Sequence, residues 1–235
     1  MKAFLLAAGL GTRLRPLTNT TPKCLIPVSG KPLLGWWVEL MEEHGIDEVL
    51  LNLHHLPAKV EQYIRSYPTR IKFRLFYEEK LLGSAGTLKA NRDFVNNSES
   101  FFILYADNLT NYNLTDFYNF HLQHKEPFSM ALFHTNNPKG CGIAVTDENG
   151  IIVDFEEKPE NPKTDLANAG MYIADSTIFD LIPEYEITDI GYHLLPKLVG
   201  RMAGWKTDDY LIDIGTIENL RKAEHEWSQI KKRSL

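Results

Sequence analysis

The stretch from Lys2 to Pro32 constrains the fold more than any other part of the chain. It begins with an apolar run, Ala3 to Ala8, which is long enough for one buried strand. The glycine-rich turn at residues 9–12 follows, and the basic residues Arg13 and Lys23 come after it. Because glycine has no Cβ, such a turn lets backbone N–H groups approach phosphate oxygens, whose charge arginine and lysine neutralise. The stretch therefore predicts a phosphate-binding turn after the first strand of an α/β sheet.

Two common phosphate-binding sequences do not match this turn. A Walker A loop requires Gly-Lys-Ser/Thr, whereas Gly11 is followed by Thr12. The dinucleotide-binding fingerprint requires a third glycine where this chain has Leu14. A dehydrogenase of that type also needs an acid after its second strand, where Asn52 and His54 stand. A nicotinamide-dependent dehydrogenase is therefore disfavoured.

Composition limits the possible partners. The chain has 235 residues, of which 43% are hydrophobic and 24% charged, as in ordinary globular proteins. Its formal net charge is −6, whereas nucleic-acid-binding proteins usually carry a basic excess. This composition allows one large α/β domain or two small ones; because no linker or internal repeat interrupts the chain, we expect a single domain over residues 1–235 that binds no nucleic acid.

The apolar N-terminal run does not resemble a signal peptide, because it is short and no processing region follows it. No later stretch approaches the roughly 20 apolar residues of a membrane span. Cys24 and Cys141 lie far apart and are read as thiols of a reducing compartment. We expect a cytoplasmic protein without membrane contact, either a monomer or a homodimer.

Three segments together carry a family resemblance. They are G-L-G-T-R-L-R-P-L-T at residues 9–18, P-K-C-L-I-P-V at 22–28 and G-K-P-L at 30–33. This combination resembles the signature of the sugar-1-phosphate nucleotidyltransferases, which make a nucleoside-diphosphate sugar and pyrophosphate from an NTP and a sugar 1-phosphate. The resemblance covers nearly the whole chain, and none of the additional C-terminal domains of longer relatives is expected.

The resemblance implies a Rossmann-like three-layer α/β sandwich with a mostly parallel central sheet. A small β-rich sugar-binding lobe is expected at roughly residues 129–170. The apolar patterns predict strands at residues 3–8, 49–53, 71–77, 101–105, 129–134, 143–145, 151–153 and 209–212. They predict helices at residues 33–41, 57–65, 176–182, 194–202 and 216–230.

On the nucleotide side, the resemblance implies that Arg13 grips the departing pyrophosphate and that Lys23 meets the charge developing at the α-phosphate. The loop L-G-S-A-G-T-L at residues 82–88 resembles the family loop that holds the nucleobase. Its small residues leave room for a flat ring, and the helix after it is expected to present N–H groups. The predicted catalytic residues are Arg13, Lys23 and Asp107; the predicted nucleotide-binding residues are Leu6, Ala8, Gly9, Gly11, Thr12 and Gly86.

On the sugar side, F-E-E-K-P at residues 155–159 matches the family element F-x-E-K-P. In the family the glutamate holds sugar hydroxyls and the lysine holds the sugar phosphate, which implies these roles for Glu157 and Lys158. Asn168 follows at the family's usual distance and is expected to meet the sugar. Gly142, Glu157, Lys158 and Asn168 are the predicted sugar-phosphate residues.

Two aspartates are predicted to hold Mg²⁺. Asp107 follows the apolar run at residues 101–105, although Ala106 stands where the family usually has glycine. Asp213 begins D-I-G-T, which resembles the family's D-x-G-T element with its second metal ligand. We expect both acids to follow strands of the parallel sheet and to face each other with no lysine or arginine between them. A divalent cation would then remove their repulsion.

The sequence constrains the base and the sugar of the substrates less than it constrains the family. The loop at residues 82–87, together with Cys24, resembles relatives that use GTP, with mannose 1-phosphate or a manno-heptose 1-phosphate as the sugar substrate. A uridylyl- or thymidylyltransferase for an amino-sugar or hexose 1-phosphate is the alternative within the class. A non-catalytic regulatory subunit that binds a nucleotide sugar is an alternative of another class. It would be expected to lack Arg13, Lys23 or one of the two aspartates, and this chain has them all.

Overall fold

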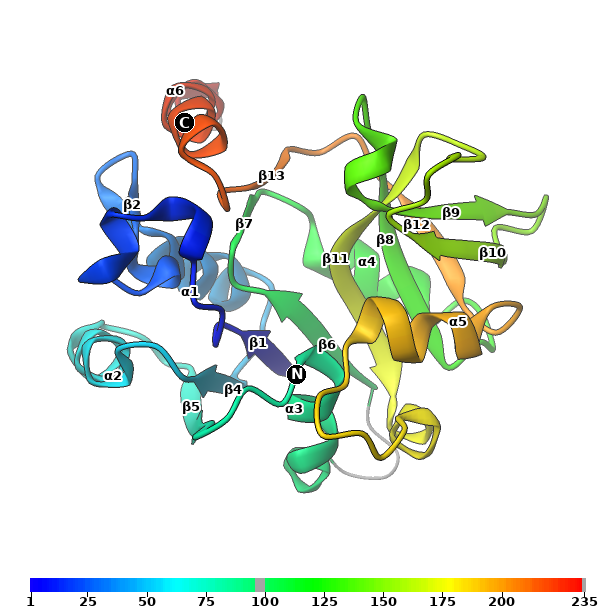
Figure 1. Cartoon of the computed structure of the whole chain (residues 1–235), viewed down its shortest axis with the longest axis horizontal. Coiled ribbons are helices and arrows are strands. Elements are labelled where there is room, and N and C mark those ends of the chain that lie inside the picture. Colours follow the sequence, from blue (N-terminus) through cyan, green and yellow to red (C-terminus); the bar gives the residue numbers. More distant parts are fainter. Residues whose placement is uncertain (96–99, 234–235) are drawn as a thin grey trace.

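The structure, a computed structural model, describes residues 1–95 and 100–233. In this part of the chain, nine strands form one sheet in the order β10-β9-β11-β6-β1-β4-β5, and β8 pairs with both β11 and β12 (Figure 1). Helices cover both faces of the sheet. The expected Rossmann-like three-layer α/β sandwich is confirmed.

The middle of the sheet is parallel. Strand β1 pairs in parallel with β4 and β6, and β4 pairs in parallel with β5. Their bounds are Lys2–Leu6 for β1, Glu48–Leu53 for β4, Lys72–Tyr77 for β5 and Ser100–Tyr105 for β6. These strands lie where the sequence predicts them, except that β1 ends at Leu6. The chain leaves the sheet there, because the N–H of Ala7 donates to the Asn52 side chain instead of to a strand.

The stretch at residues 129–170 contributes strands to the same sheet. The strands of this region are β8 (Phe128–His134), β9 (Gly142–Thr146), β10 (Ile152–Glu157) and β11 (Leu166–Asp175). Strand β11 runs antiparallel to β6, β8 and β9, so it joins these strands to the parallel centre. The predicted sugar-binding lobe is thus an extension of the central sheet.

The segment at residues 190–206 differs from its prediction. A helix was expected at residues 194–202, but a π-helix at Ile190–Leu194 leads into a short α5 at Leu195–Leu198. The chain then turns at Gly200, whose φ is +77°, and the carbonyl of Met202 accepts a hydrogen bond from the N–H of Ile152. Strand β12 (Ala203–Lys206) follows and pairs in parallel with β8. Pairing with a distant strand overrides the helical pattern here.

Alternate residues of the central strands face opposite helical layers, as in parallel sheets that are covered on both sides. Leu5 belongs to the buried cluster that contacts α1, α2, α4 and α6. Phe4 belongs to the cluster that contacts α3 and α5. The α-helices are α1 (Leu33–Glu43), α2 (Pro57–Ser66), α3 (Ser84–Ala90), α4 (Leu114–His121), α5 and α6 (Ile217–Arg233).

Two small ladders stand apart from the main sheet. Strand β7 (Asn108–Thr110) pairs antiparallel with β13 (Leu211–Asp213), and β2 (Pro27–Val28) pairs with β3 (Lys31–Pro32). The remaining short helices are η1 (Thr12–Leu14), η2 (Leu17–Asn19), η3 (Lys23–Leu25), η4 (Arg92–Phe94), η5 (Pro138–Gly140) and η6 (Ser176–Leu181). Among the described residues, no helix has both the length and the apolar character that a membrane span requires.

Candidate active site

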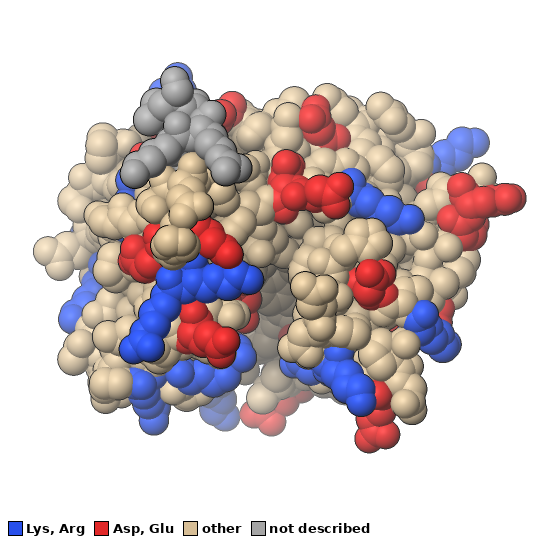
Figure 2. Space-filling view, turned by 90° about the horizontal axis from the view of Figure 1, so that it is seen from above, with Lys and Arg blue, Asp and Glu red and all other residues tan. Residues whose placement is uncertain are grey.

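A cleft of about 1250 Å³ lies between the two halves of the molecule. Figure 2 shows it as a hollow at the centre of one face. Its walls come from the ends of β6 and β11, from β9 and β10, and from β13 and one side of α6. The predicted site residues that line it are Arg13, Asp107, Gly142, Glu157, Lys158, Asn168 and Asp213.

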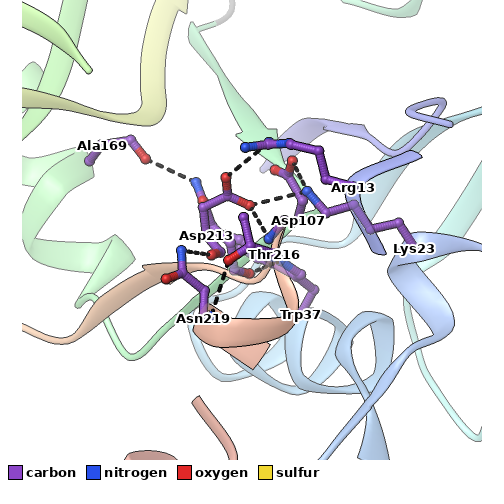
Figure 3. Close-up of polar contacts among 10 residues, drawn as sticks. Arg13, Lys23, Trp37, Asp107, Ala169, Asp213, Thr216 and Asn219 are labelled. Atoms are coloured by element: carbon purple, nitrogen blue, oxygen red, sulfur yellow. Dashed lines mark hydrogen bonds and ion pairs between the residues drawn. The ribbon is translucent and has the colours of Figure 1, made fainter. Parts of the chain in front are cut away.

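Lys23 lies between the two predicted metal ligands. Its Nζ is 2.6 Å from Oδ2 of Asp107 and 3.1 Å from Oδ1 of Asp213 (Figure 3). The lysine is only 8% exposed, because it begins the short helix η3 under the wall of the cleft. The expectation that no cation separates the two acids is therefore wrong. Their mutual repulsion is already offset by a buried ammonium group.

Asp213 reaches the cleft by a different route from the one expected. Strand β13 does not belong to the parallel sheet; it pairs antiparallel with β7, and this pairing sets Asp213 opposite Asn108. The N–H of Ile214 donates to the carbonyl of Asp107 at 3.0 Å, which ties the two acidic segments together. Asp107 itself follows β6 directly, as predicted. One acid thus depends on the parallel sheet and the other on a two-stranded ladder.

The loop after β13 fixes the Asp213 carboxylate. Its Oδ1 accepts the N–H of Gly215 at 2.7 Å, and Asn219 at the start of α6 donates to its backbone carbonyl at 2.8 Å. Gly215 also makes room for Arg13, because a Cβ there would lie 2.8 Å from the guanidinium. The Arg13 side chain is 66% exposed, and its guanidinium lies 3.7 Å from Oδ2 of Asp213. Arg13 is therefore held only loosely and remains available to a ligand.

The glycine-rich turn has a defined shape. Gly11 has a φ of +61°, and a Cβ there would lie 2.8 Å from Cγ2 of Thr18. The Thr18 hydroxyl donates to the carbonyl of Gly11 at 2.8 Å and so fixes the turn from below. Gly9 faces open space. Nucleotide contacts of the turn stay predictions, for Leu6, Ala8, Gly9, Gly11 and Thr12 alike.

The loop before α3 is organised by a partner that the sequence analysis missed. The N–H groups of Ala85 and Gly86 donate to the carbonyl of Thr188 at 2.9 and 3.0 Å, and the N–H of Thr188 donates back to Leu82 at 2.8 Å. The expectation that this helix start presents free N–H groups is therefore wrong for these two residues. A nucleobase contact of Gly86 stays a prediction, which now rests on its lack of a side chain.

Asp189 is a second residue that the sequence analysis missed. Its Oδ1 accepts the N–H groups of Gly191 and Tyr192 at 2.8 and 3.3 Å, and its Oδ2 accepts the hydroxyl of Ser84 at 2.9 Å. It caps the π-helix and ties it to the start of α3. An acid directly before a helix is a capping signal, which could have identified it from the sequence.

On the opposite wall, glycines surround the Glu157 carboxylate. A Cβ at Gly142 would lie 2.6 Å from its Oε2, and a Cβ at Gly191 would lie 2.8 Å from the same atom. Burial raises the pKa of Glu157, an effect that Lys158 opposes and Asp189 reinforces. Among residues 1–95 and 100–233, no side chain or backbone N–H donates a hydrogen bond to this carboxylate, and Nζ of Lys158 lies 3.8 Å away.

Lys158 and Asn168 complete this wall. Lys158 has a φ of +51°, a left-handed conformation that is uncommon for lysine. Its N–H donates to the carbonyl of Cys141 at 3.1 Å, while its side chain is 56% exposed. Asn168 is held by its neighbours, since it donates to the Tyr172 hydroxyl at 2.7 Å and accepts from the N–H of Gly170 at 2.9 Å.

Curated proteins of known name are similar to this chain. It is 36% identical over 218 residues to UTP–glucose-1-phosphate uridylyltransferase of Synechocystis, an alignment that covers 85% of this chain and 55% of that protein. It is 31% identical over 220 residues to mannose-1-phosphate guanylyltransferase catalytic subunit beta of Dictyostelium discoideum, with 92% and 61% covered. The chain thus spans a little over half the length of these relatives.

Solved structures have the same fold as this chain, and the sequence profile of one protein family matches it. HddC from Yersinia pseudotuberculosis complexed with GMP-PN superposes with a TM-score of 0.81 at 25% identity, over 96% of this chain and 99% of that one. UDP-glucose pyrophosphorylase complexed with UDP-glucose superposes with a TM-score of 0.84 at 22% identity, over 97% and 98%, and supports the fold alone. The profile of the family described as nucleotidyl transferase matches residues 2–229, and this chain therefore belongs to that family.

Proposed function

We propose that this cleft transfers a nucleotidyl group from an NTP to a sugar 1-phosphate and releases pyrophosphate. The observation that carries the proposal is the position of Lys23 between Asp107 and Asp213 on a cleft wall that Arg13 also reaches. In this reaction an anionic phosphate oxygen attacks the α-phosphorus in line, so no general base is required. The difficulty is the approach of two anions, which cations and backbone N–H groups relieve.

Each basic residue has a role that follows from its position. Lys23 is a cation fixed at the acid pair, where it can neutralise charge that develops on an α-phosphate. Arg13 is exposed and loosely held, as suits a residue that follows a departing pyrophosphate. The turn at residues 9–12 supplies backbone N–H groups beside both.

The donor set of the acid pair fits Mg²⁺. Mg²⁺ in proteins is held by one or two carboxylates, with water and substrate phosphate oxygens as its other ligands. Asp107 and Asp213 are close enough for one ammonium group to bridge them, and their side chains are 35% and 44% exposed. The two residues would hold the ion on the cleft side, and Mg²⁺ would supply positive charge against the phosphates of both substrates. Lys23 keeps the pair together from the buried side.

The opposite wall supports a sugar phosphate. Glu157 has acceptor oxygens that no described group of the protein occupies, so hydroxyl groups of a sugar can donate to them. Gly142 leaves the space beside this carboxylate open. The Lys158 side chain is exposed in the cleft, where it can meet the phosphate, and Asn168 lines the same cleft. These four residues come from residues 129–170, which supports the role of this region as the sugar-binding lobe.

For the substrates, we propose GTP with mannose 1-phosphate or a manno-heptose 1-phosphate. The Dictyostelium relative named as a mannose-1-phosphate guanylyltransferase and the HddC structure with GMP-PN support this choice. The Synechocystis relative named as a uridylyltransferase favours the alternative, UTP with a hexose 1-phosphate. A thymidylyltransferase remains a third possibility within the class.

One assay tests the proposed reaction class and the proposed substrates. Pyrophosphate release is measured for each of GTP, UTP, dTTP and ATP with mannose, manno-heptose, glucose and N-acetylglucosamine 1-phosphates. Activity in any combination supports the class, and the highest kcat/KM identifies the substrates. Binding of a nucleotide sugar without turnover in every combination would instead favour the non-catalytic regulatory subunit. A higher kcat/KM with UTP or dTTP would reject the proposed base while the class survives.

A further inference from the structure

Three polar side chains lie buried together beneath the carboxyl ends of β1, β4 and β5. Asn52, Glu78 and Thr87 are 4%, 2% and 1% exposed. Nδ2 of Asn52 lies 2.8 Å from Oε1 of Glu78 and 3.2 Å from Oγ1 of Thr87, and the Thr87 hydroxyl lies 2.5 Å from the same Glu78 oxygen. The mechanism above uses none of them. We call these three residues the buried polar cluster.

On one side, the buried polar cluster holds the start of the phosphate-binding turn. Oδ1 of Asn52 accepts the backbone N–H of Ala7 at 2.6 Å, at the point where the chain leaves β1. A backbone N–H can only donate, so this bond also fixes which way the Asn52 amide faces. The NH₂ group of Asn52 must then point toward Glu78 and Thr87. The path of the chain into the turn depends on this one amide.

On the other side, the cluster holds the loop at residues 82–87. Oε2 of Glu78 accepts the backbone N–H of Leu82 at 3.0 Å, and Thr87 lies on α3, at the far end of the same loop. The nearby Lys80 does not neutralise Glu78, since it pairs with Glu186 at 3.7 Å. Among residues 1–95 and 100–233 no cation forms an ion pair with Glu78, so hydrogen bonds stabilise its buried side chain. The side chain of Glu78 therefore fixes both ends of the loop.

We propose that Asn52, Glu78 and Thr87 form a positioning unit that fixes the loop at residues 82–87 relative to the phosphate-binding turn. A nucleoside triphosphate that extends from the loop to the turn would have its base at the loop and its phosphates at the turn. The buried polar cluster then sets the distance over which the nucleotide binds. The inference rests on the proposed function, because that function makes the loop and the turn two ends of one site.

A purely structural role would not require polar residues here. Asn52 stands between the buried leucines Leu51 and Leu53 of β4, where another apolar residue would continue the strand. Burying an amide, a hydroxyl and a carboxylate is unfavourable unless each is hydrogen-bonded. A cluster in which every member is bonded admits few alternative arrangements and so specifies one geometry.

Thr87 offers a matched pair of variants. Thr87→Val keeps the shape of the side chain and removes the hydroxyl, whereas Thr87→Ser keeps the hydroxyl. Thr69→Val is the control, because the Thr69 hydroxyl also donates to a glutamate, Glu42 at 2.8 Å, on a surface far from the cleft. The dissociation constants of GTP and UTP are measured by calorimetry, and KM is measured for both substrates.

For Thr87→Val we expect the dissociation constant and KM of the accepted NTP to rise about tenfold, as for one lost hydrogen bond to a charged group. The KM of the sugar phosphate should change less than twofold. Thr87→Ser and Thr69→Val should bind NTP like the unmodified chain. Equal rises for both substrates, or NTP binding by Thr87→Val that matches Thr87→Ser, would overturn the inference.

Hydrogen exchange provides a readout that does not depend on turnover. In Thr87→Val the amide of Leu82 should exchange faster, while in Asn52→Leu the amide of Ala7 should do so. Unchanged exchange at both amides would overturn the positioning role even if activity fell. If the unmodified chain binds no NTP and releases no pyrophosphate, the proposed function fails and the inference fails with it. If the unmodified chain is active, failure of the Thr87 comparison rejects the positioning unit alone.

Discussion

The two walls of the cleft differ in how far the protein itself satisfies their charged groups. The wall that we propose for the nucleotide, with Arg13, Lys23, Asp107 and Asp213, is called the nucleotide wall; there the Lys23 ammonium contacts both Asp107 at 2.6 Å and Asp213 at 3.1 Å. The wall that we propose for the sugar phosphate, with Gly142, Glu157, Lys158 and Asn168, is called the sugar wall; there Glu157 accepts no hydrogen bond from the described residues, and Lys158 lies 3.8 Å from it. One wall is a closed network, whereas the charges of the other wall meet only in the 3.8 Å ion pair of Lys158 and Glu157.

The backbone of the two walls differs in the same way. The segment of Asp213 is fixed by the β7–β13 ladder and by Asn219, which donates to its carbonyl. Lys158 instead has an uncommon left-handed backbone conformation, held by one hydrogen bond to Cys141. We infer that the nucleotide wall has its working geometry before any substrate arrives, and that the sugar wall reaches its geometry with the substrate. Preorganised charge is the more effective of the two in catalysis.

The largest effects should come from breaking the nucleotide wall at its acids. Asp107→Asn and Asp213→Asn should each lower kcat/KM about a thousandfold, or about 4 kcal/mol, because each removes a proposed metal ligand and a partner of Lys23. The double variant should lose little more than the worse single one, since the groups act as a unit. Pyrophosphate release measures this, and circular dichroism checks that the variants fold.

Removal of the metal tests the same wall. Chelation by EDTA should abolish turnover by the unmodified chain, and added Mg²⁺ should restore it. Strictly additive losses in the double variant, or full activity in EDTA, would contradict a shared metal site at the acid pair.

The next effect comes from the basic residues of this wall. Lys23→Met should lower kcat, because the substitution leaves two acids without their counter-ion.

Arg13→Ala should raise KM for NTP more than for the sugar phosphate. Charge-assisted contacts are worth about 1.5–3 kcal/mol, so each loss should be at least about tenfold. Lys72→Met, on the exposed part of β5, is the control and should behave like the unmodified chain. Equal changes in both KM values for Arg13→Ala would contradict two functionally separate walls.

The sequence predicts the parts of this comparison that depend on local pattern. Apolar runs of strand length predict β1, β4, β5 and β6, and the position of Asp107 after β6 follows from them. The resemblance to the nucleotidyltransferases directs attention to Lys23, Glu157 and Lys158. Local pattern and family signature together therefore predict the fold and part of the cleft lining, namely Arg13, Asp107, Gly142, Glu157, Lys158, Asn168 and Asp213.

The sequence does not predict contacts between distant segments. Lys23 is separated from Asp107 by 84 positions and from Asp213 by 190, so its place between them depends on the complete fold. Strand β12 has only four residues, and its pairing with β8 is what makes it a strand. The bonds of Thr188 to the loop before α3 are of the same kind. No residue pattern in the sequence indicates which backbone groups of distant segments pair with each other.

A smaller effect is expected from the sugar wall. Lys158→Ala should raise KM for the sugar phosphate about tenfold, through the loss of one charge-assisted contact, and leave KM for NTP nearly unchanged. Lys163→Ala, which removes an exposed lysine paired with Asp154, is the matched control. A comparable rise in KM for NTP would show that Lys158 also serves the nucleotide wall.

The smallest effect concerns the protonation of Glu157. Because burial raises the pKa of Glu157 above its ordinary value of 4.5, its carboxylate form is lost at a higher pH than that of an exposed glutamate. A protonated carboxyl group accepts sugar hydroxyls less well, so KM for the sugar phosphate should rise as the pH falls. The loss of about one hydrogen bond corresponds to roughly a fivefold change.

Glu157→Gln separates this titration from that of the substrate, because its amide does not titrate and the substrate phosphate affects both proteins equally. The ratio of the two KM values should therefore change as the pH is lowered from 8 toward 4.5, the ordinary pKa of a glutamate. The protonation of Glu157 does not itself promote unfolding: the folded protein binds this proton more tightly than the unfolded chain, so this group's contribution to the free energy of unfolding increases as the pH falls. A ratio that stays constant across this range would show that the Glu157 carboxylate is not an acceptor for the sugar, and the contrast between the two walls would then rest on Lys158 alone.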